Sequence, residues 1–135
     1  MLQRDYILRL IREFLAALAR VLEKKDVTTR REELQKLYEQ YVGPYAFYFT
    51  ASTEDVLRSF DDESTERRFY KMEMLAELYY AEADMVSKPD SDRLLEHAYV
   101  LFDLIDRDGK TFSFERRHKM ADIRRQLDEL AEQKN

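Results

Sequence analysis

The stretch DLIDRDGKTFSFE, residues 103–115, has the residue types and spacing of a calcium-binding loop. Such a loop has oxygen ligands at positions 1, 3 and 5, glycine at position 6 and a bidentate glutamate at position 12. With Gly109 at position 6, Asp106 and Asp108 fall at positions 3 and 5. Glu115 then falls at position 12, so the stretch agrees with a calcium loop at four positions.

The same stretch departs from a calcium loop at its first ligand. Position 1 falls on Leu104, which has no side-chain oxygen, and Lys110 brings a positive charge beside the site. A hard cation needs the missing carboxylate. We therefore interpret the stretch as a turn between two helices and expect no metal there. In this turn Gly109 adopts a left-handed conformation, and Thr111 or Ser113 caps the next helix.

The two histidines belong to none of the common catalytic or metal-binding motifs. His97 lies beside the apolar stripe of its helix, where we expect a packed core residue, and His118 lies among basic residues on an exposed face. The sequence has no His-Glu-x-x-His motif and no phosphate-binding glycine loop, and none of Glu73, Glu77 and Glu82 stands three residues before a histidine. Carboxylates such as Glu73, Glu77 and Glu82 are interpreted as solvated helix faces. We therefore predict no catalytic residue, no cofactor and no metal ligand.

The composition predicts one all-α domain spanning residues 1–135. A chain of this length fits a single domain. It contains only two glycines and two prolines, the residues that usually interrupt regular structure. Good helix formers dominate, and the absence of cysteine excludes disulfides and thiolate metal sites.

Hydrophobic periodicity divides the chain into about six helices. The first, residues 5–25, is a long amphipathic helix, and the second begins at Thr29 with a capping box to Glu32. The segment 43–53 is compatible with a short helix or an extended linker. The segment 93–106 is apolar almost all round, so we expect it at the centre of the core. The other predicted helices are a short one capped by Ser52, a long one over residues 65–86 and a last one from about residue 113.

Charge is distributed unevenly along the chain. The net charge is −5, which argues against a nucleic-acid partner. Residues 1–25 and 116–125 are basic, whereas residues 54–108 are strongly acidic. Either the basic ends pack near the acidic middle, or they form a strip that docks a partner. No stretch is apolar enough to span a membrane and the start does not resemble a signal peptide, so we expect a cytoplasmic protein.

Aromatic residues gather around the Gly43-Pro44 pair. The chain has nine tyrosines, of which Tyr41, Tyr45 and Tyr48 lie close to this pair. Tyrosine suits half-buried surfaces, including interfaces. These three rings either fill a core that lacks tryptophan or contact a partner.

The first helix carries more apolar surface than one neighbour can cover. Leu8 and Leu15 widen the stripe formed by Ile7, Ile11 and Phe14, and one packed helix covers only a narrow seam. We predict that a second copy of the chain covers Leu8 and Leu15, which gives a homodimer. The alternative is that later helices of the same chain cover them.

Two segments resemble known proteins. The stretch LAELYYAEADM, residues 75–85, resembles the first helix of a tetratricopeptide repeat, which implies that the next helix packs against it as a hairpin. The opening DYILRLIREFLAALARVL, together with KTFSFERRHKM, resembles a family of small bacterial helical proteins with no assigned activity. The resemblance implies a tetratricopeptide-like antiparallel helical array and no functional residue.

These features favour a helical protein-protein interaction module without catalytic activity. Its partner is an unknown protein or a second copy of the chain, and Leu8, Leu15, Tyr41, Tyr45 and Tyr48 are the candidate contact residues. One alternative is a peripheral membrane-surface protein anchored by the basic first helix. Another is a small-ligand binder with a tyrosine-lined pocket.

Overall fold

The computed structural model describes the backbone of residues 2–109 and 111–133, and the side chains of residues 4–109 and 111–128. The described residues form helices and no strand, which confirms the all-α prediction. The segment 43–53, for which the sequence allowed a short helix or an extended linker, contains a short helix. The described residues therefore contain seven helices instead of the six predicted. The helices are α1 (Leu2–Leu22), α2 (Val27–Tyr41), α3 (Tyr45–Thr50), α4 (Thr53–Arg58), α5 (Thr65–Ala83), α6 (Asp90–Asp108) and α7 (Phe114–Gln133).

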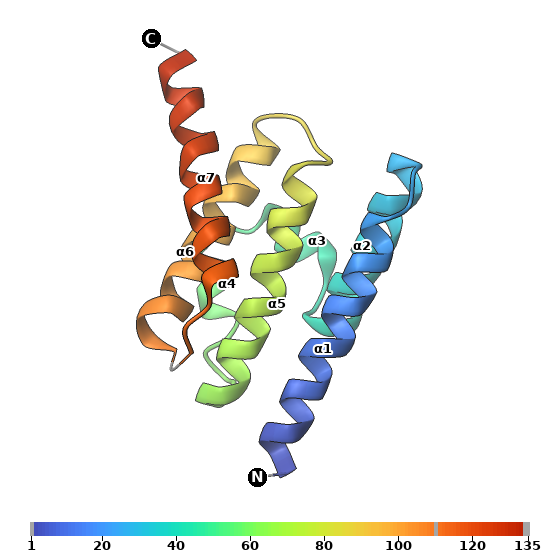
Figure 1. Cartoon of the computed structure of the whole chain (residues 1–135), viewed down its shortest axis with the longest axis vertical. Helices are drawn as coiled ribbons and strands as arrows, with labels where there is room; N and C mark the ends of the chain where they lie inside the picture. Colours follow the sequence, from blue (N-terminus) through green and yellow to red (C-terminus); the bar gives the residue numbers. More distant parts are fainter. Residues whose placement is uncertain (1, 110, 134–135) are drawn as a thin grey trace.

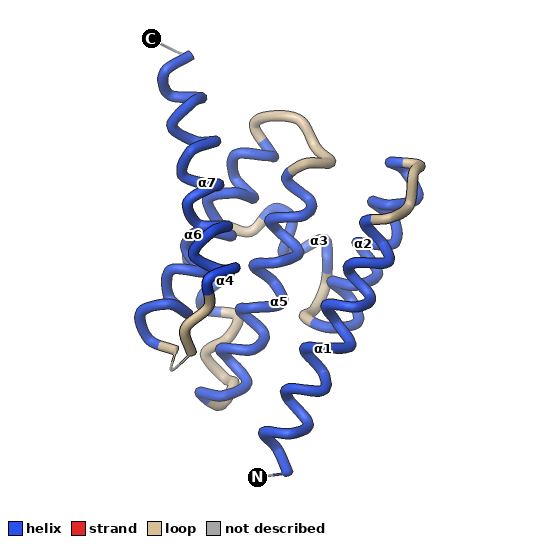
Figure 2. Tube along the Cα trace, viewed as in Figure 1, coloured by secondary structure: helices blue, strands red, loops and turns tan. Residues whose placement is uncertain are grey.

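The long helices alternate in direction along the chain. Helices α1, α5 and α7 run upward in Figure 1, whereas α2 and α6 run downward. In this view α5 lies between α1 and α7 on the side nearest the viewer, with α2 and α6 behind them. The tube in Figure 2 shows short connections between α1 and α2 and between α5 and α6, which therefore form two antiparallel hairpins. The packing of α6 on α5 is the most extensive helix contact, as the tetratricopeptide resemblance implies.

The central helix of the fold is α5 and not α6, so the prediction for residues 93–106 is wrong in this respect. Helix α5 contacts α1, α2 and α6, and its buried residues point in several directions. They include the polar residues Tyr70, Tyr79 and Glu82. Helix α6 buries one face, formed by residues such as Leu94, Leu101 and Ile105, against α5 and α7.

Polar side chains at the N-termini define where the helices begin. Asp26 caps α2, because its Oδ2 accepts hydrogen bonds from Thr29 N at 2.9 Å and from Thr29 Oγ1 at 2.7 Å. The predicted capping box at Thr29 is therefore wrong, since the carboxylate three residues earlier already satisfies these donors. Ser52 and Ser113 cap α4 and α7, as predicted: their Oγ atoms accept from Asp55 N at 3.2 Å and from Arg116 N at 3.1 Å.

His97 holds the connection between α3 and α4 against α6. Its Nε2 donates to Ala51 O at 2.7 Å, which leaves Nδ1 free to accept from Thr53 Oγ1 at 3.2 Å. The ring also contacts Tyr79, whose hydroxyl donates to Tyr48 O at 2.7 Å. The side chain is buried, so the prediction of a packed core histidine is confirmed.

Replacing Leu101 tests the packing of α6. This side chain is only 1% exposed, and we expect Leu101→Ala to lower the free energy of unfolding by about 2–5 kcal/mol, because it leaves a cavity that the neighbours only partly fill. Urea denaturation measures the change. As a control, Val27→Ala removes apolar atoms at an exposed position and should change stability by about 0.5 kcal/mol or less. A loss below about 1 kcal/mol for Leu101→Ala would contradict the packing.

His97 should make the fold sensitive to mild acid. Burial lowers the pKa of His97 in the folded chain, whereas an unfolded histidine has a pKa of about 6.5. As pH falls from 7 to 5 the unfolded chain therefore binds a proton that the folded chain does not, and stability decreases.

The variant His97→Gln removes this effect. We expect its free energy of unfolding to fall by about 1 kcal/mol less than that of the wild type over the same pH interval. His118→Gln changes the exposed histidine and serves as the matched control. We expect its free energy of unfolding to depend on pH as that of the wild type does. If the free energies of unfolding of the wild type and of His97→Gln depend equally on pH, His97 binds a proton as tightly in the folded chain as in the unfolded chain.

Candidate functional site

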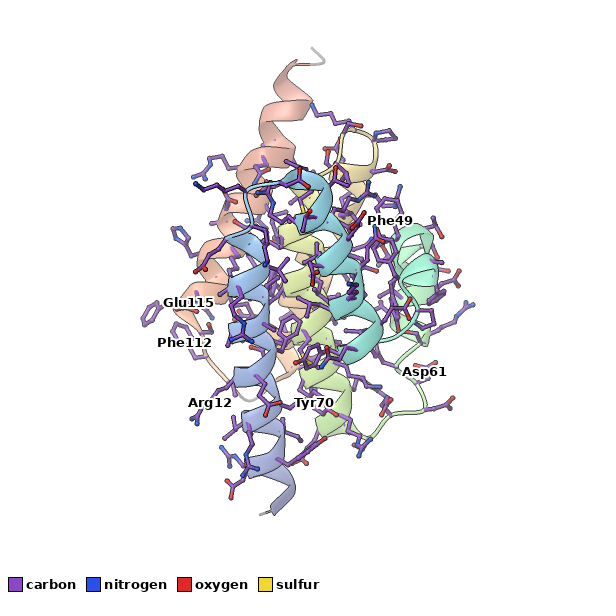
Figure 3. The ribbon with its side chains drawn as sticks, turned by 90° about the vertical axis from the view of Figure 1, so that its right-hand side faces the viewer. Arg12, Phe49, Asp61, Tyr70, Phe112 and Glu115 are labelled. Atoms are coloured by element: carbon purple, nitrogen blue, oxygen red, sulfur yellow. The ribbon has the colours of Figure 1, made fainter. Side chains whose placement is uncertain are left out.

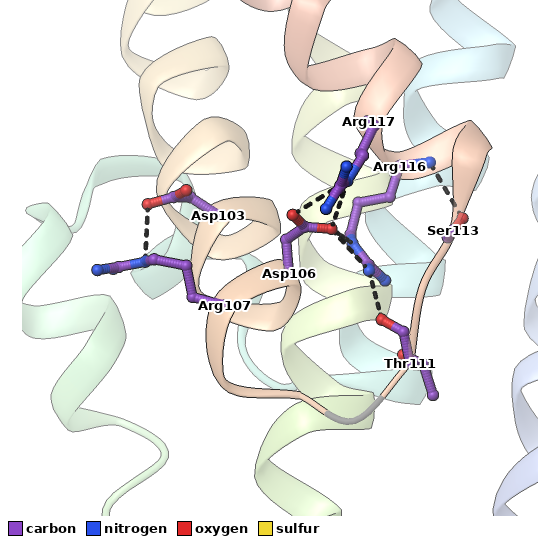
Figure 4. A network of polar contacts seen from close by, with 7 residues as sticks. All are labelled: Asp103, Asp106, Arg107, Thr111, Ser113, Arg116 and Arg117. Atoms are coloured by element: carbon purple, nitrogen blue, oxygen red, sulfur yellow. Dashed lines mark hydrogen bonds and ion pairs between the residues drawn. The ribbon is translucent and has the colours of Figure 1, made fainter.

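Asp106, which falls at position 3 of the rejected calcium loop, forms ion pairs with two arginines (Figure 4). Its Oδ1 lies 2.9 Å from Arg116 Nη2, and its Oδ2 lies 3.3 Å from Arg117 Nε. Arg116 is buried and also donates to Thr111 O at 2.6 Å. These contacts hold the start of α7 against the end of α6. In the described part of the chain, no group of three or more histidine, aspartate or glutamate side chains is placed to hold a metal ion.

Gly109 is not left-handed, so that part of the turn prediction is wrong. Its φ of −74° and ψ of 154° are extended values that other residues also adopt. Its role is steric, because a Cβ atom at this position would lie 2.6 Å from Ile105 O. The glycine therefore allows the chain to pass close to the last turn of α6.

Glu82 is completely buried, which corrects its interpretation as part of a solvated face. Tyr38 donates its hydroxyl hydrogen to Glu82 Oε1 at 2.8 Å, and Tyr45 donates to the other oxygen. Arg31 Nε lies 3.5 Å from Glu82 Oε2 and forms an ion pair. Burial, followed by the hydrogen bond to Glu82, raises the pKa of Tyr45 to about 12. The cluster therefore fixes α2 and α3 against α5.

The three candidate tyrosines around Gly43-Pro44 serve the fold. Tyr48 is 5% exposed and its hydroxyl donates to Ser59 Oγ at 3.0 Å. Tyr41 is half-buried and packs edge-on against Phe14, with ring centroids 5.2 Å apart. Tyr45 is also half-buried and is bound to Glu82. Of the three rings only Tyr48 lies in the interior, whereas Tyr41 and Tyr45 pack against the core and stay partly exposed.

Leu8 and Leu15 lie on a stripe of α1 that the rest of the described chain leaves exposed. Their exposed fractions are 45% and 43%, and that of Leu22 is 43%. The three leucines are seven residues apart, and Ile11 and Leu18 complete a heptad pattern typical of helix pairing. The alternative that later helices cover Leu8 and Leu15 is therefore wrong. Leu22 was missed, although its heptad spacing could have revealed it.

A groove lies next to Leu22, at the end of this stripe. Helices α1 and α7 form its sides and α5 forms its floor. Its volume is about 380 Å³. The open side of α5 presents Glu73, Glu77, Tyr80 and Asp84, which follow one another at helical spacing. We call this surface, together with the leucine stripe of α1, the α5 groove. Its lining includes Leu18 and Leu22 of α1, Glu77, Tyr80 and Asp84 of α5, and Lys119 of α7.

The α5 groove contains charges of both signs, because Arg30 of α2 and Lys119 of α7 line it together with Glu77 and Asp84. Lys119 Nζ lies 2.7 Å from Glu77 Oε1 and offsets one carboxylate. Burial, followed by the charge of Glu77, raises the pKa of Glu73, and burial, followed by the charge of Asp122, raises the pKa of Asp84. Both shifts mark positions where a further positive charge would be stabilising.

The two basic ends of the chain behave differently. The segment that begins α7 packs on the acidic middle through Lys119 and Arg116, which confirms that interpretation for this end. The arginines of α1 instead point into solvent, and Arg9, Arg12 and Arg20 are exposed. Figure 3 shows Arg12 on the same side of the molecule as Phe112 and Glu115, and Asp61 on the other.

Comparisons with protein-family models, with curated proteins and with solved structures found no match to this chain. The two resemblances seen in the sequence therefore stay predictions. Among the residues that the structure describes, no helix combines the length and hydrophobicity that crossing a membrane requires.

The variant Tyr38→Phe tests the buried cluster. It removes one of the two hydroxyl donors of a carboxylate that has no access to water, so we expect the free energy of unfolding to fall by about 1–3 kcal/mol. Thermal or urea denaturation measures the loss. Tyr6→Phe removes a hydroxyl from a ring that is 56% exposed and should change stability by less than about 0.5 kcal/mol. Equal stabilities of the two variants would show that the bond from Tyr38 to Glu82 contributes nothing.

Proposed function

We propose that the protein is a helical interaction module and that the α5 groove is its docking surface. The exposed heptad stripe Leu8, Leu15 and Leu22 on α1 is the observation that carries this proposal. Leucines at this spacing are buried when a second helix packs against them. In the described fold Leu22, at the end of this stripe, lines an open groove.

The groove fits a helix better than an extended peptide. A bound helix places residues of its own at three- and four-residue intervals. The leucines of α1 and the polar residues of α5 follow the same intervals, and the stripe from Leu8 to Leu22 is about 21 Å long at 1.5 Å per residue.

The two alternative functions find less support. Contact of Leu22 with an anionic membrane would bring Glu77 and Asp84 close to the lipid headgroups, and their repulsion offsets the attraction of Arg30 and Lys119. A tyrosine-lined ligand pocket would need free hydroxyls. Those of Tyr38, Tyr45 and Tyr48 are bound within the fold.

Site-specific photo-crosslinking tests the proposal. A photoreactive amino acid replaces Leu22 or Asp84, which line the groove, in cells that produce the protein. We expect both positions to form a covalent product with a polypeptide. The control position is Glu96, which is exposed on α6. Equal yields at the groove positions and at Glu96, or no product at any of them, would defeat the docking proposal.

A further inference from the structure

We infer that the surface between α6 and α7 binds a short acidic segment of a partner protein, and that Arg117 and Arg124 contact its carboxylates. A hollow of about 250 Å³ marks this surface, which we call the α6–α7 hollow. Its lining consists of Tyr99, Asp106, Arg117, Met120, Ala121 and Arg124. These residues differ from those that line the α5 groove, so the site is a second one, beyond the proposed function.

The α6–α7 hollow has a net positive charge. Asp106 is the acidic residue of its lining, and both Arg116 and Arg117 form ion pairs with this carboxylate, which leaves one positive charge uncompensated. Arg124 adds a second positive charge, because its guanidinium donates a hydrogen bond to the neutral hydroxyl of Tyr99. Arginine binds carboxylates with paired hydrogen bonds, so an acidic segment is complementary to this surface.

Aromatic rings hold both guanidinium groups in place. That of Arg117 lies over the ring of Phe112, 4.6 Å from its centroid, and that of Arg124 lies over Tyr99 at 5.4 Å. The two arginines are seven residues apart on α7, which places them on one face of the helix and about 10.5 Å apart along its axis. Because these side chains are already ordered, they lose less conformational freedom when a carboxylate binds.

Two exposed phenylalanines at the lower end of the hollow favour an apolar residue in the same segment. Phe114 is 80% exposed and Phe112 is 58% exposed, the highest values for large apolar side chains in the described chain. Their rings pack edge-on with centroids 4.7 Å apart, beside Arg117. An apolar side chain next to the acidic residues of the segment would cover these rings.

The surroundings of the hollow favour a short acidic peptide over a nucleic acid. Asp128 follows Arg124 by four residues, Glu96 precedes Tyr99 by three, and both carboxylates are exposed. They repel an anionic chain that extends beyond the two arginines. The net charge of −5 adds to this repulsion for a nucleic acid, which carries a charge at every phosphate.

Fluorescence anisotropy with a synthetic peptide tests the inference. The probe is a fluorescein-labelled peptide of about eight residues in which glutamate alternates with phenylalanine, long enough to span the hollow when extended. At low ionic strength we expect the wild type to bind it with a dissociation constant of about 100 μM or lower. Two-dimensional NMR spectra should show a larger amide shift at Ala121, in the hollow, than at Ala81, in the α5 groove.

Two variants and a matched control locate the binding. Arg124→Glu should raise the dissociation constant about tenfold, because it replaces attraction by repulsion. Phe114→Ser should raise it about threefold, because it removes an apolar ring that the probe would cover. The control Arg20→Glu changes an exposed arginine on α1, alters the net charge by the same amount and should have less than about a twofold effect. Circular dichroism verifies that each variant is folded.

Three results would overturn the inference. They are no binding of the acidic peptide, equal weakening by Arg124→Glu and Arg20→Glu, and equal affinity for a peptide with lysine in place of glutamate. Tighter binding of a single-stranded oligonucleotide or of anionic phospholipid vesicles, if Arg124→Glu weakens it, would overturn the inference in favour of that partner. Crosslinking from Leu22 and Asp84 reports on the α5 groove alone, so failure of this inference and failure of the proposed function are distinguishable.

Discussion

The buried carboxylate of Glu82 is the constraint on which the arrangement of the two hairpins depends. A charged group without access to water is strongly destabilising unless donors surround it, and here the donors come from other elements. Tyr38 and Arg31 belong to α2, and Tyr45 belongs to α3. Helix α2 therefore has a fixed register on α5, which a purely apolar contact would specify less sharply. Because α1 packs on α2 through Phe14 and Tyr41, the position of α1 is set as well.

The open surface follows from how the remaining sides of α5 are covered. Helices α2 and α6 occupy its rear, and α1 covers part of its front through Leu18. Helix α7 is held at the other edge by Lys119 and by the ion pair between Arg116 and Asp106. What stays open is the strip from Glu73 to Asp84, bordered by the leucines of α1. The features that we assign to docking are thus the parts of α1 and α5 that the fold does not use.

Much of the fold could be predicted from the sequence, because helix periodicity and capping are local. The helices, the caps at Ser52 and Ser113 and the buried His97 all depended on residues within a few positions of one another. The errors concern contacts between distant segments. Glu82 looked like a surface residue, since its partners Tyr38 and Tyr45 lie about forty residues away. For the same reason α5 was not recognised as the central helix. Leu8 and Leu15 were identified as uncovered by their own chain, but the groove next to Leu22 depends on the packing of α1, α5 and α7 and could not be predicted.

Hydroxyl-radical footprinting as a function of protein concentration tests most directly whether a second copy covers Leu8 and Leu15 of α1. The oxidation rate of each side chain reports its access to water, and Leu15 is 43% exposed in the single chain. The account predicts that the oxidation rate of Leu15 falls several-fold as the concentration rises from nanomolar to tens of micromolar. That of Phe47, which is 38% exposed on α3, should stay constant. If Leu15 and Phe47 are oxidised at constant rates over the whole range, no second copy covers Leu15 and the predicted homodimer is wrong.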